Sequence, residues 1–258
     1  MTQPYLNYDV ISNDYDQRYP SSQHWERGDA LLNLVRQIKA KTILEVGSGT
    51  GFWLNLLHQV TPQLYGMDFS AGMIARARNQ PAPLKLTRGT ATHLPYQTAT
   101  FDLLYCVDAI HHFEDHAAFI CEAFRVLKPG GTLAVIGHDP HSADGNWYVY
   151  DYFETVYETD LLRYPSGDRV KALMKQTGFQ DVQQQNVEHV LNIHTGENVL
   201  NEPFLKQSAT SQLALLDEVV YQAGIEKIKA DLKRAQGCGE QIVFKSDFWV
   251  RMFSGIKA

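Results

Sequence analysis

Short apolar runs alternate with helical patterns from residue 42 to residue 137. Buried strands are predicted at Thr42–Val46, Leu64–Met67, Leu84–Thr87, Phe101–Val107 and Thr132–Ile136. Apolar residues at helical spacing lie between most of these strands. Strands separated by helices form βαβ units, and their crossovers are right-handed. The pattern therefore predicts an α/β fold, with a doubly wound, mostly parallel sheet and helices on both faces.

The segments on either side of this region have different patterns. Residues 1–41 are polar and rich in tyrosine, and they end in a helical stretch, so we expect a leader that packs on the domain. Residues 195–236 have helical spacing between a mostly polar strand and a final strand. We expect four parts: an N-terminal lid or leader (1–41), a cofactor-binding α/β core (42–194), a helical insertion that caps the acceptor (195–240) and a C-terminal strand that completes the core sheet (241–258).

The composition excludes some classes of protein. Hydrophobic residues are 44% and charged residues 20% of the 258, which is typical of a globular chain. The net charge of −6 disfavours a duplex nucleic-acid partner. The start lacks a secretory signal, and no apolar run approaches the roughly 20 residues needed to span a bilayer. Three cysteines without CxxC spacing indicate reduced thiols, so we expect a cytoplasmic protein.

A glycine-rich loop follows the first predicted strand. Residues 45–51 read EVGSGTG, and alternate glycines allow a tight turn that brings backbone N–H groups against a ligand. Asp68 ends the next strand, where a carboxylate can accept both hydroxyls of a ribose. Together they indicate a nucleoside site at the carboxyl edge of the sheet. The alternative is a structural turn, with Asp68 or Ser70 capping the next helix.

Four stretches of the chain resemble the class I S-adenosylmethionine-dependent methyltransferases in their order and spacing. They are ILEVGSGTG at 43–51, GMDFSAGMIARAR at 66–78, GTATHLPYQTATFDLLYCVDAIHH at 89–112 and RVLKPGGTLAVI at 125–136. The resemblance implies a Rossmann-like fold with seven strands, the last antiparallel and inserted beside the fifth. It also implies that the cofactor is S-adenosyl-L-methionine and the product S-adenosyl-L-homocysteine, with no metal.

The resemblance also assigns roles to cofactor-binding residues. The loop residues Gly47, Ser48 and Gly49 would lie at the methionine part of the cofactor, and Asp68 would hold the ribose. Phe69 and Met73 would pack on the adenine, Ala91 and Thr92 would line its edge, and Val107 would approach the methionine amine through its carbonyl. Relatives often carry an acid where this chain has Thr90, whose hydroxyl can still accept a hydrogen bond.

Candidates for the acceptor side follow from their position in the chain. In related enzymes the leader folds over the cofactor, so Tyr15 and Arg18 are candidate lid residues, and Arg18 could pair with the methionine carboxylate. The alternative is a packed tyrosine and a surface arginine. His112, which follows the fourth strand with His111, and His138, which closes the fifth, are candidate catalytic bases. Their alternative role is structural, and Asp139 beside His138 would point to the opposite face of a strand.

An aromatic segment follows the fifth strand and contains Trp147, Tyr148, Tyr150, Tyr152, Phe153 and Tyr157. It is interpreted as an aromatic acceptor pocket, as a cation–π cage, or as one packed face of a helix. We expect an S-adenosylmethionine-dependent methyltransferase that acts on a small-molecule acceptor by in-line transfer. A non-catalytic S-adenosylmethionine-binding regulator is one alternative. The other is a nicotinamide-dependent oxidoreductase, which is disfavoured because Phe52 stands where the third glycine of the dinucleotide loop would fall.

Overall fold

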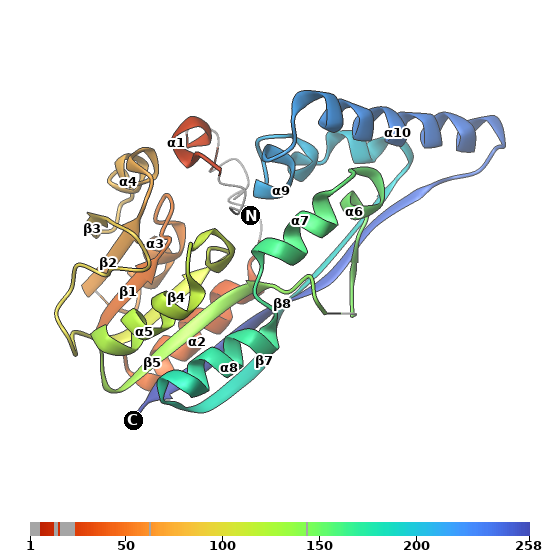
Figure 1. Ribbon diagram of the computed structural model, residues 1–258. Helices are drawn as coiled ribbons and strands as arrows, with labels where there is room; N and C mark the ends of the chain where they lie inside the picture. Colours follow the sequence, from red (N-terminus) through yellow and green to blue (C-terminus); the bar gives the residue numbers. More distant parts are fainter. Residues whose placement is uncertain (1–5, 13–14, 16–23, 62, 143) are drawn as a thin grey trace.

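The computed structural model describes residues 6–12, 15, 24–61, 63–142 and 144–258 (Figure 1). Arg18 of the predicted lid lies outside these residues. Among them the strands form an eight-stranded sheet in the order β3-β2-β1-β4-β5-β8-β6, with β7 also paired to β8. The strands are β1 (Thr42–Val46), β2 (Gln63–Asp68), β3 (Lys85–Arg88), β4 (Phe101–Val107), β5 (Leu127–His138), β6 (Asn146–Trp147), β7 (Phe179–Thr195) and β8 (Val243–Lys257).

The strand directions confirm the predicted topology. The first five strands pair in parallel, and β8 lies antiparallel beside β5, with Thr132 opposite Ile256. The predicted number of seven strands was one too few. The additional strand is β6, whose two residues pair with Asp247 and Ser246 of β8. A two-residue strand carries no alternation of apolar and polar residues, so the sequence pattern could not reveal it.

Two hydrophobic clusters cover the two faces of the sheet. Neighbouring residues of one strand enter different clusters, as Ile43 and Leu44 do in β1, because successive side chains of a strand point to opposite faces. Helices α2 (Glu26–Ile38) and α3 (Phe52–Leu57) pack on the face of Ile43. Helices α5 (His116–Val126) and α8 (Gly167–Thr177) pack on the face of Leu44. The fold is therefore the doubly wound layer structure that the pattern predicts.

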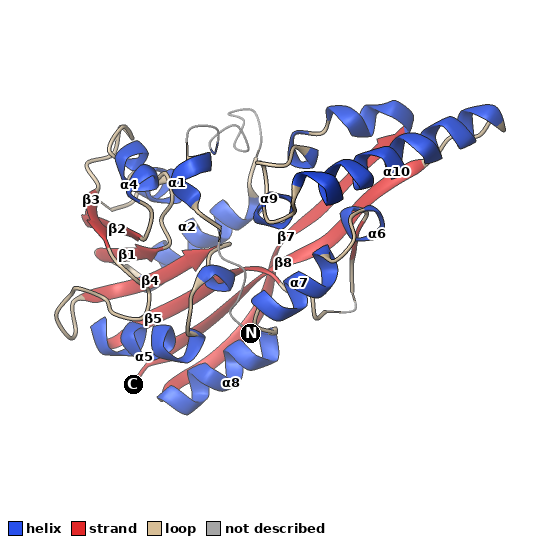
Figure 2. Ribbon diagram, turned by 45° about the horizontal axis from the view of Figure 1, so that its top comes forward, coloured by secondary structure: helices blue, strands red, loops and turns tan. Residues whose placement is uncertain are grey.

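The distal halves of β7 and β8 extend beyond the rest of the sheet (Figure 2), and a third hydrophobic cluster packs on this part of β8. Figure 2 shows α10 lying along these two strands. The elements of this part are α6 (Val149–Tyr152), α7 (Val156–Arg163), the 3₁₀ helices Gly196–Asn201 and Pro203–Leu205, α9 (Ser211–Ala214) and α10 (Glu218–Gly237). No helix in the described part of the chain is both long and apolar enough to cross a membrane.

The first described residues of the leader form the short helix α1 (Tyr8–Ile11). This helix contacts the start of α4 (Ala71–Ala77). The Asp9 carboxylate accepts hydrogen bonds from the Ser70 hydroxyl at 2.5 Å and from the Gly72 backbone N–H at 2.8 Å. Gly72 leaves no room for a side chain, because a Cβ there would lie 2.7 Å from the Ser12 Oγ atom. The leader thus packs on the domain beside the carboxyl end of β2.

Candidate active site

The glycine loop between β1 and α3 has backbone angles that residues with a side chain rarely adopt. Gly47 and Gly51 have φ angles of 75° and 77°, in the left-handed region where a side chain is strained. A Cβ at Gly47 would lie 2.6 Å from the Ala109 Cβ, and one at Gly51 would lie 2.8 Å from a Leu84 methyl. The loop therefore turns tightly against the segment that follows β4.

Asp68, the last residue of β2, is fixed beside this loop by two backbone hydrogen bonds. The N–H groups of Gly49 and Ser70 each donate to one of its carboxylate oxygens at 2.8 Å. Burial raises the pKa of Asp68 above its ordinary value of 3.8, and the two N–H donors oppose that shift. Ser70, whose hydroxyl accepts from the Met73 N–H at 3.0 Å, is the N-cap of α4. Of the two predicted cap candidates, Ser70 has that role and Asp68 does not.

A cavity of about 660 Å³ opens at the carboxyl edge of the sheet, between the ends of β1, β2 and β4. Ten residues predicted for the site line it together: Tyr15, Gly47, Gly49, Asp68, Phe69, Met73, Ala91, Thr92, Val107 and His112. Phe69 is 52% exposed, which is unusual for a large apolar side chain. Thr90 also lines the cavity, and its hydroxyl lies 3.4 Å from that of Thr92.

Two predicted site residues do not line this cavity. Ser48 is buried in the glycine loop, where its N–H donates to the Met67 carbonyl at 3.0 Å. His138 lines a second cavity further along β5 and β8. The carboxylate of Asp139 accepts from the backbone N–H groups of His141 and Gly167, so it does not orient His138. This placement does not support the predicted catalytic role of His138.

Several residues that line the cavity were not predicted as site residues. Tyr8 of α1 and Asp108, which follows β4, are the most informative of them. Asp108 has a φ angle of 47° and is held there by the Arg27 guanidinium, whose Nη1 lies 2.5 Å from its Oδ2. Arg27 also donates to both carboxylate oxygens of Glu188, at 2.7 and 2.9 Å. This buried ion pair joins α2 and β7 to the turn after β4.

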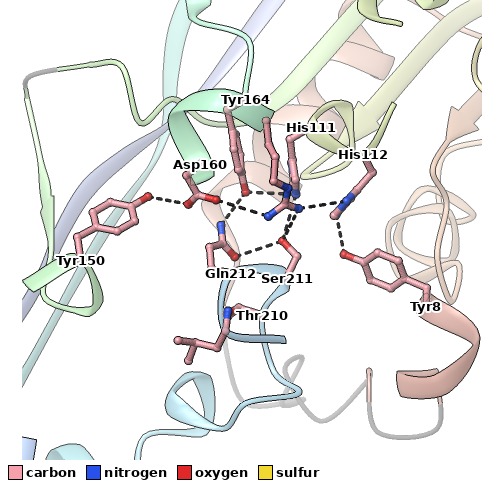
Figure 3. Close-up of polar contacts among 11 residues, drawn as sticks. Tyr8, His111, His112, Tyr150, Asp160, Tyr164, Thr210, Ser211 and Gln212 are labelled. Atoms are coloured by element: carbon pink, nitrogen blue, oxygen red, sulfur yellow. Dashed lines mark hydrogen bonds and ion pairs between the residues drawn. The ribbon is translucent and has the colours of Figure 1, made fainter. Parts of the chain in front are cut away.

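His112 belongs to a polar network that begins at the cavity with Tyr8 and extends away from it to Asp160 and Tyr150 (Figure 3). The Tyr8 hydroxyl lies 2.6 Å from its Nε2 atom, and Arg163 Nη2 lies 3.3 Å from its Nδ1. Arg163 also donates to the Ser211 hydroxyl at 3.1 Å. Its Nη1 lies 3.6 Å from Asp160, and both residues of this ion pair are at most 1% exposed. Tyr150 closes the far end by donating to Asp160 at 2.9 Å.

These contacts determine which nitrogen of His112 carries the proton. A guanidinium has only donors, so the Nδ1 of His112 accepts from Arg163. A neutral imidazole then carries its hydrogen on Nε2 and donates it to the Tyr8 hydroxyl oxygen. The Tyr8 hydroxyl oxygen is then the acceptor in this hydrogen bond. Taking up a proton at Nδ1 would place it against the guanidinium, so this arrangement favours His112 as a donor that orients Tyr8.

Burial shifts the pKa values of two groups in this network, His111 and Asp160. Burial lowers the pKa of His111 well below 6.5, and the charge of Arg163 lowers it further. Burial raises the pKa of Asp160 to about 6, although Arg163 opposes the shift. His111 is therefore neutral near pH 7, and it stacks on the Tyr164 ring at 3.9 Å. In the part of the chain that the structure describes, no three acidic, histidine or cysteine side chains are grouped as metal ligands would be.

The comparisons with known proteins agree with this geometry. Residues 44–135 match the family model described as a methyltransferase domain. A demethylmenaquinone methyltransferase of Deinococcus radiodurans is 28% identical over 179 residues, which cover 60% of this chain and 73% of that protein.

Two solved structures show the same fold. A protein of Anabaena variabilis, described as a methyltransferase from an antibiotic biosynthesis pathway, has a TM-score of 0.65 at 19% identity, covering 90% of this chain and 99% of that one. Phosphoethanolamine N-methyltransferase 2 of Haemonchus contortus, solved with S-adenosyl-L-methionine, has a TM-score of 0.60 at 18% identity, covering 96% and 57%. With the cavity at the carboxyl edge, the domain match leads to one conclusion: residues 44–135 form a methyltransferase domain, which supports the resemblance of the chain to the class I S-adenosylmethionine-dependent methyltransferases.

Proposed function

We propose that this protein transfers the methyl group of S-adenosyl-L-methionine to a small-molecule acceptor by in-line displacement. The observation that carries the proposal is that two sets of residues line the same cavity. Gly49 and Asp68 lie in the part suited to a nucleoside, and Tyr8 and His112 supply polar groups to the same cavity. A donor and an acceptor held in one enclosed space meet the main requirement of a displacement reaction, which is positioning.

The residues present fit the cofactor. Asp68 is held by backbone donors, and each carboxylate oxygen has a second lone pair for a ribose hydroxyl. Gly49 leaves open space, because a Cβ there would approach no closer than 3.8 Å to the Tyr15 ring. We assign the adenine to Phe69 and Met73, with Ala91 and Thr92 at its edge, and the methionine part to Gly47, Gly49 and the Val107 carbonyl. Tyr15 would cover the methionine part from the leader.

The chemistry divides between cofactor and protein. S-adenosyl-L-methionine supplies, when bound, a methyl group on a sulfonium, which leaves as a neutral thioether. The protein positions the acceptor, excludes water and orients hydrogen-bond donors. We assign the donor role to the Tyr8 hydroxyl, oriented by the Nε2–H of His112. We assign no base role to His112, because its Nδ1 faces Arg163.

A small acceptor is supported by the enclosure of the site and by its relatives. The leader packs on α4 at one edge of the cavity and contacts His112 at another. The Deinococcus radiodurans relative is named for demethylmenaquinone, which is not a nucleic acid, and the net charge of −6 is unfavourable for a nucleic-acid acceptor. The helices between β7 and β8 would cap the acceptor, since Ser211 of α9 contacts Arg163 behind His112.

The test is transfer of labelled methyl from S-adenosyl-L-methionine to a fractionated metabolite extract. We expect one low-molecular-weight fraction to take up label, and the Asp68→Ala variant to leave it unlabelled at the same cofactor concentration. Calorimetry with S-adenosyl-L-homocysteine and with NAD accompanies the assay. Binding of S-adenosyl-L-homocysteine without transfer to any fraction would indicate the non-catalytic regulator. Binding of NAD alone would overturn the proposal.

A further inference from the structure

A second cavity, of about 540 Å³, lies between the end of β5, the segment from β6 to α7 and the middle of β8. None of the described residues lines both this cavity and the cofactor cavity. Its wall is aromatic: Trp147, Tyr150, Tyr157, Phe248 and Trp249. Trp147 lies against Tyr150 with ring centroids 5.4 Å apart, and Tyr150 lies 5.0 Å from Tyr157.

The aromatic segment after β5 thus divides into two groups with different surroundings. Tyr148 and Tyr152 donate from their hydroxyls to Glu202 and Asp231 and pack on Phe244 in the third hydrophobic cluster. Trp147 and Tyr150 belong to the same cluster but also line the second cavity, together with Tyr157. Tyr157 is 40% exposed, so part of its ring is open to a ligand. Packing of the protein interior therefore accounts for Tyr148 and Tyr152, but it does not explain why three rings face this cavity.

The charges around this cavity favour a cation. Five acidic residues line it, Asp139, Asp144, Asp151, Glu154 and Glu158, against two basic residues, Lys227 and Arg251. Arg251 is already paired with Asp144. Asp151, Glu154 and Glu158 are exposed, so they form an acidic rim beside the aromatic wall. An aromatic face with carboxylates near it attracts an organic cation through the ring quadrupole and through charge.

His138 adds polar groups without adding charge. Burial, together with the charges of Arg251 and Arg27, lowers its pKa to about 4, so the ring is neutral near pH 7. The ring lies 4.5 Å from that of Phe248. Both of its nitrogens are buried, and neither forms a hydrogen bond of good geometry with a described side chain, although the backbone of Trp249 opposes the lowering of the pKa. Buried polar atoms without partners are uncommon, which is consistent with a site that a polar ligand completes.

We propose that this cavity is a second ligand site, separate from the methyl-transfer site, and that it takes a small organic cation with a substituted ammonium group. The ammonium group lies against Trp147, Tyr150 and Tyr157, with Glu154 and Glu158 at the rim. The site also touches the network behind the cofactor cavity, because Tyr150 donates to Asp160, which pairs with Arg163. A ligand bound in this cavity therefore contacts Tyr150, which lies at the far end of the network that includes His112.

The experiment compares choline with its uncharged carbon analogue, 3,3-dimethylbutan-1-ol, by calorimetry and tryptophan fluorescence on the full chain. Choline is expected to bind saturably and at least about tenfold more tightly than the alcohol, since only the cation gains from the ring quadrupoles. Saturating S-adenosyl-L-homocysteine should leave choline bound. Equal binding of the two probes, no binding of choline, or displacement of choline by S-adenosyl-L-homocysteine would overturn the proposal.

Two matched variants separate the wall from the rim. Tyr157→Phe keeps the ring and should keep choline affinity within about twofold, whereas Tyr157→Ala should weaken it by about tenfold. Glu154→Gln with Glu158→Gln removes rim charge on exposed positions, which keeps the fold, and should weaken choline but not the alcohol. Each variant is checked for unchanged S-adenosyl-L-homocysteine affinity. Choline affinity that stays at the wild-type value in both Tyr157→Ala and the rim variant would contradict the proposed site.

Discussion

The Tyr8 hydroxyl lies 2.6 Å from Nε2 of His112, although the two residues are 104 positions apart in the chain. The next residue, Asp9, accepts from the Gly72 N–H at the start of α4. The short helix α1 is therefore attached at two points of the cofactor cavity, one after β2 and one after β4. The leader contributes part of the cavity lining and does not merely pack on the outside of the domain.

Removing the Tyr8 hydroxyl should slow methyl transfer more than it weakens cofactor binding. Tyr8→Phe keeps the ring and loses the hydroxyl that His112 contacts. We expect turnover to fall by about 5- to 150-fold, the range of one to three kcal/mol for a lost hydrogen bond at a reacting centre. His112→Ala should slow turnover by at least as much. The measurement is the rate of label transfer to the acceptor fraction, with S-adenosyl-L-homocysteine affinity as the control.

Asp68 should determine both the strength and the pH dependence of cofactor binding. Asp68→Ala is expected to weaken S-adenosyl-L-homocysteine by ~1–3 kcal/mol, because charge-assisted bonds to the ribose are lost. Burial raises the pKa of Asp68, so protonation begins at a higher pH than for an exposed aspartate. Affinity should therefore fall as the pH is lowered through that raised pKa.

The control is Asp68→Asn, which should bind weakly with no such pH dependence. Calorimetry from neutral pH down to the acid limit of the fold measures both effects. Unchanged affinity in folded Asp68→Ala would remove Asp68 from the site, and equal pH profiles of the wild type and Asp68→Asn would assign the pH dependence to another group.

That the residues proposed for the cofactor line one cavity could be predicted because their signals are local. The glycine loop and Asp68 each stand at the end of a strand, and parallel strands bring their carboxyl ends to one edge of the sheet. His138 also stands at a strand end, but β5 continues past β4 and places it in the other cavity. The sequence pattern does not show which of the two cavities a residue at the end of a strand will line.

The network behind His112 could not be predicted for a different reason. Arg163 and Asp160 lie in α7, beyond the region of regular strand and helix alternation, and nothing in their spacing distinguishes a buried ion pair from a solvated one. Both are nonetheless among the most buried residues of the described chain. Only the packing of α7 against α9 and the turn after β4 makes Arg163 a partner of His112.

Arg163 should be required for the His112 tautomer and for stability. Arg163→Gln leaves the Asp160 carboxylate buried without its cation, which should cost ~3–5 kcal/mol of unfolding free energy. Nitrogen NMR of labelled histidine in the wild type should show His112 protonated at Nε2 and not at Nδ1. The variant should show a mixture of tautomers.

A double-mutant cycle tests the ion pair separately. Arg163→Gln with Asp160→Asn removes both charges, and it should be less destabilised than the sum of the two single variants. Denaturant unfolding at fixed pH gives the four free energies. Strict additivity would show that the pair does not interact, and an Nδ1-protonated His112 in the wild type would contradict the assigned hydrogen-bond directions.

Glu45 should make the protein less stable as the pH rises. It is 1% exposed, and its carboxyl accepts from the Tyr105 hydroxyl at 3.0 Å. Burial raises its pKa well above the ordinary value of 4.5, and the charge of Asp68 raises it further. The folded state therefore holds a proton that the unfolded state releases, so unfolding free energy is lost as the pH rises from 4.5 through the raised pKa. Glu45→Gln keeps the shape without the charge, so its stability relative to the wild type should grow over that range, by about 1.4 kcal/mol per unit of pKa shift.

Urea unfolding at several pH values measures the difference, with the exposed Glu240→Gln as a matched control. A constant difference between Glu45→Gln and the wild type across the range would show that Glu45 is ionised in the folded protein.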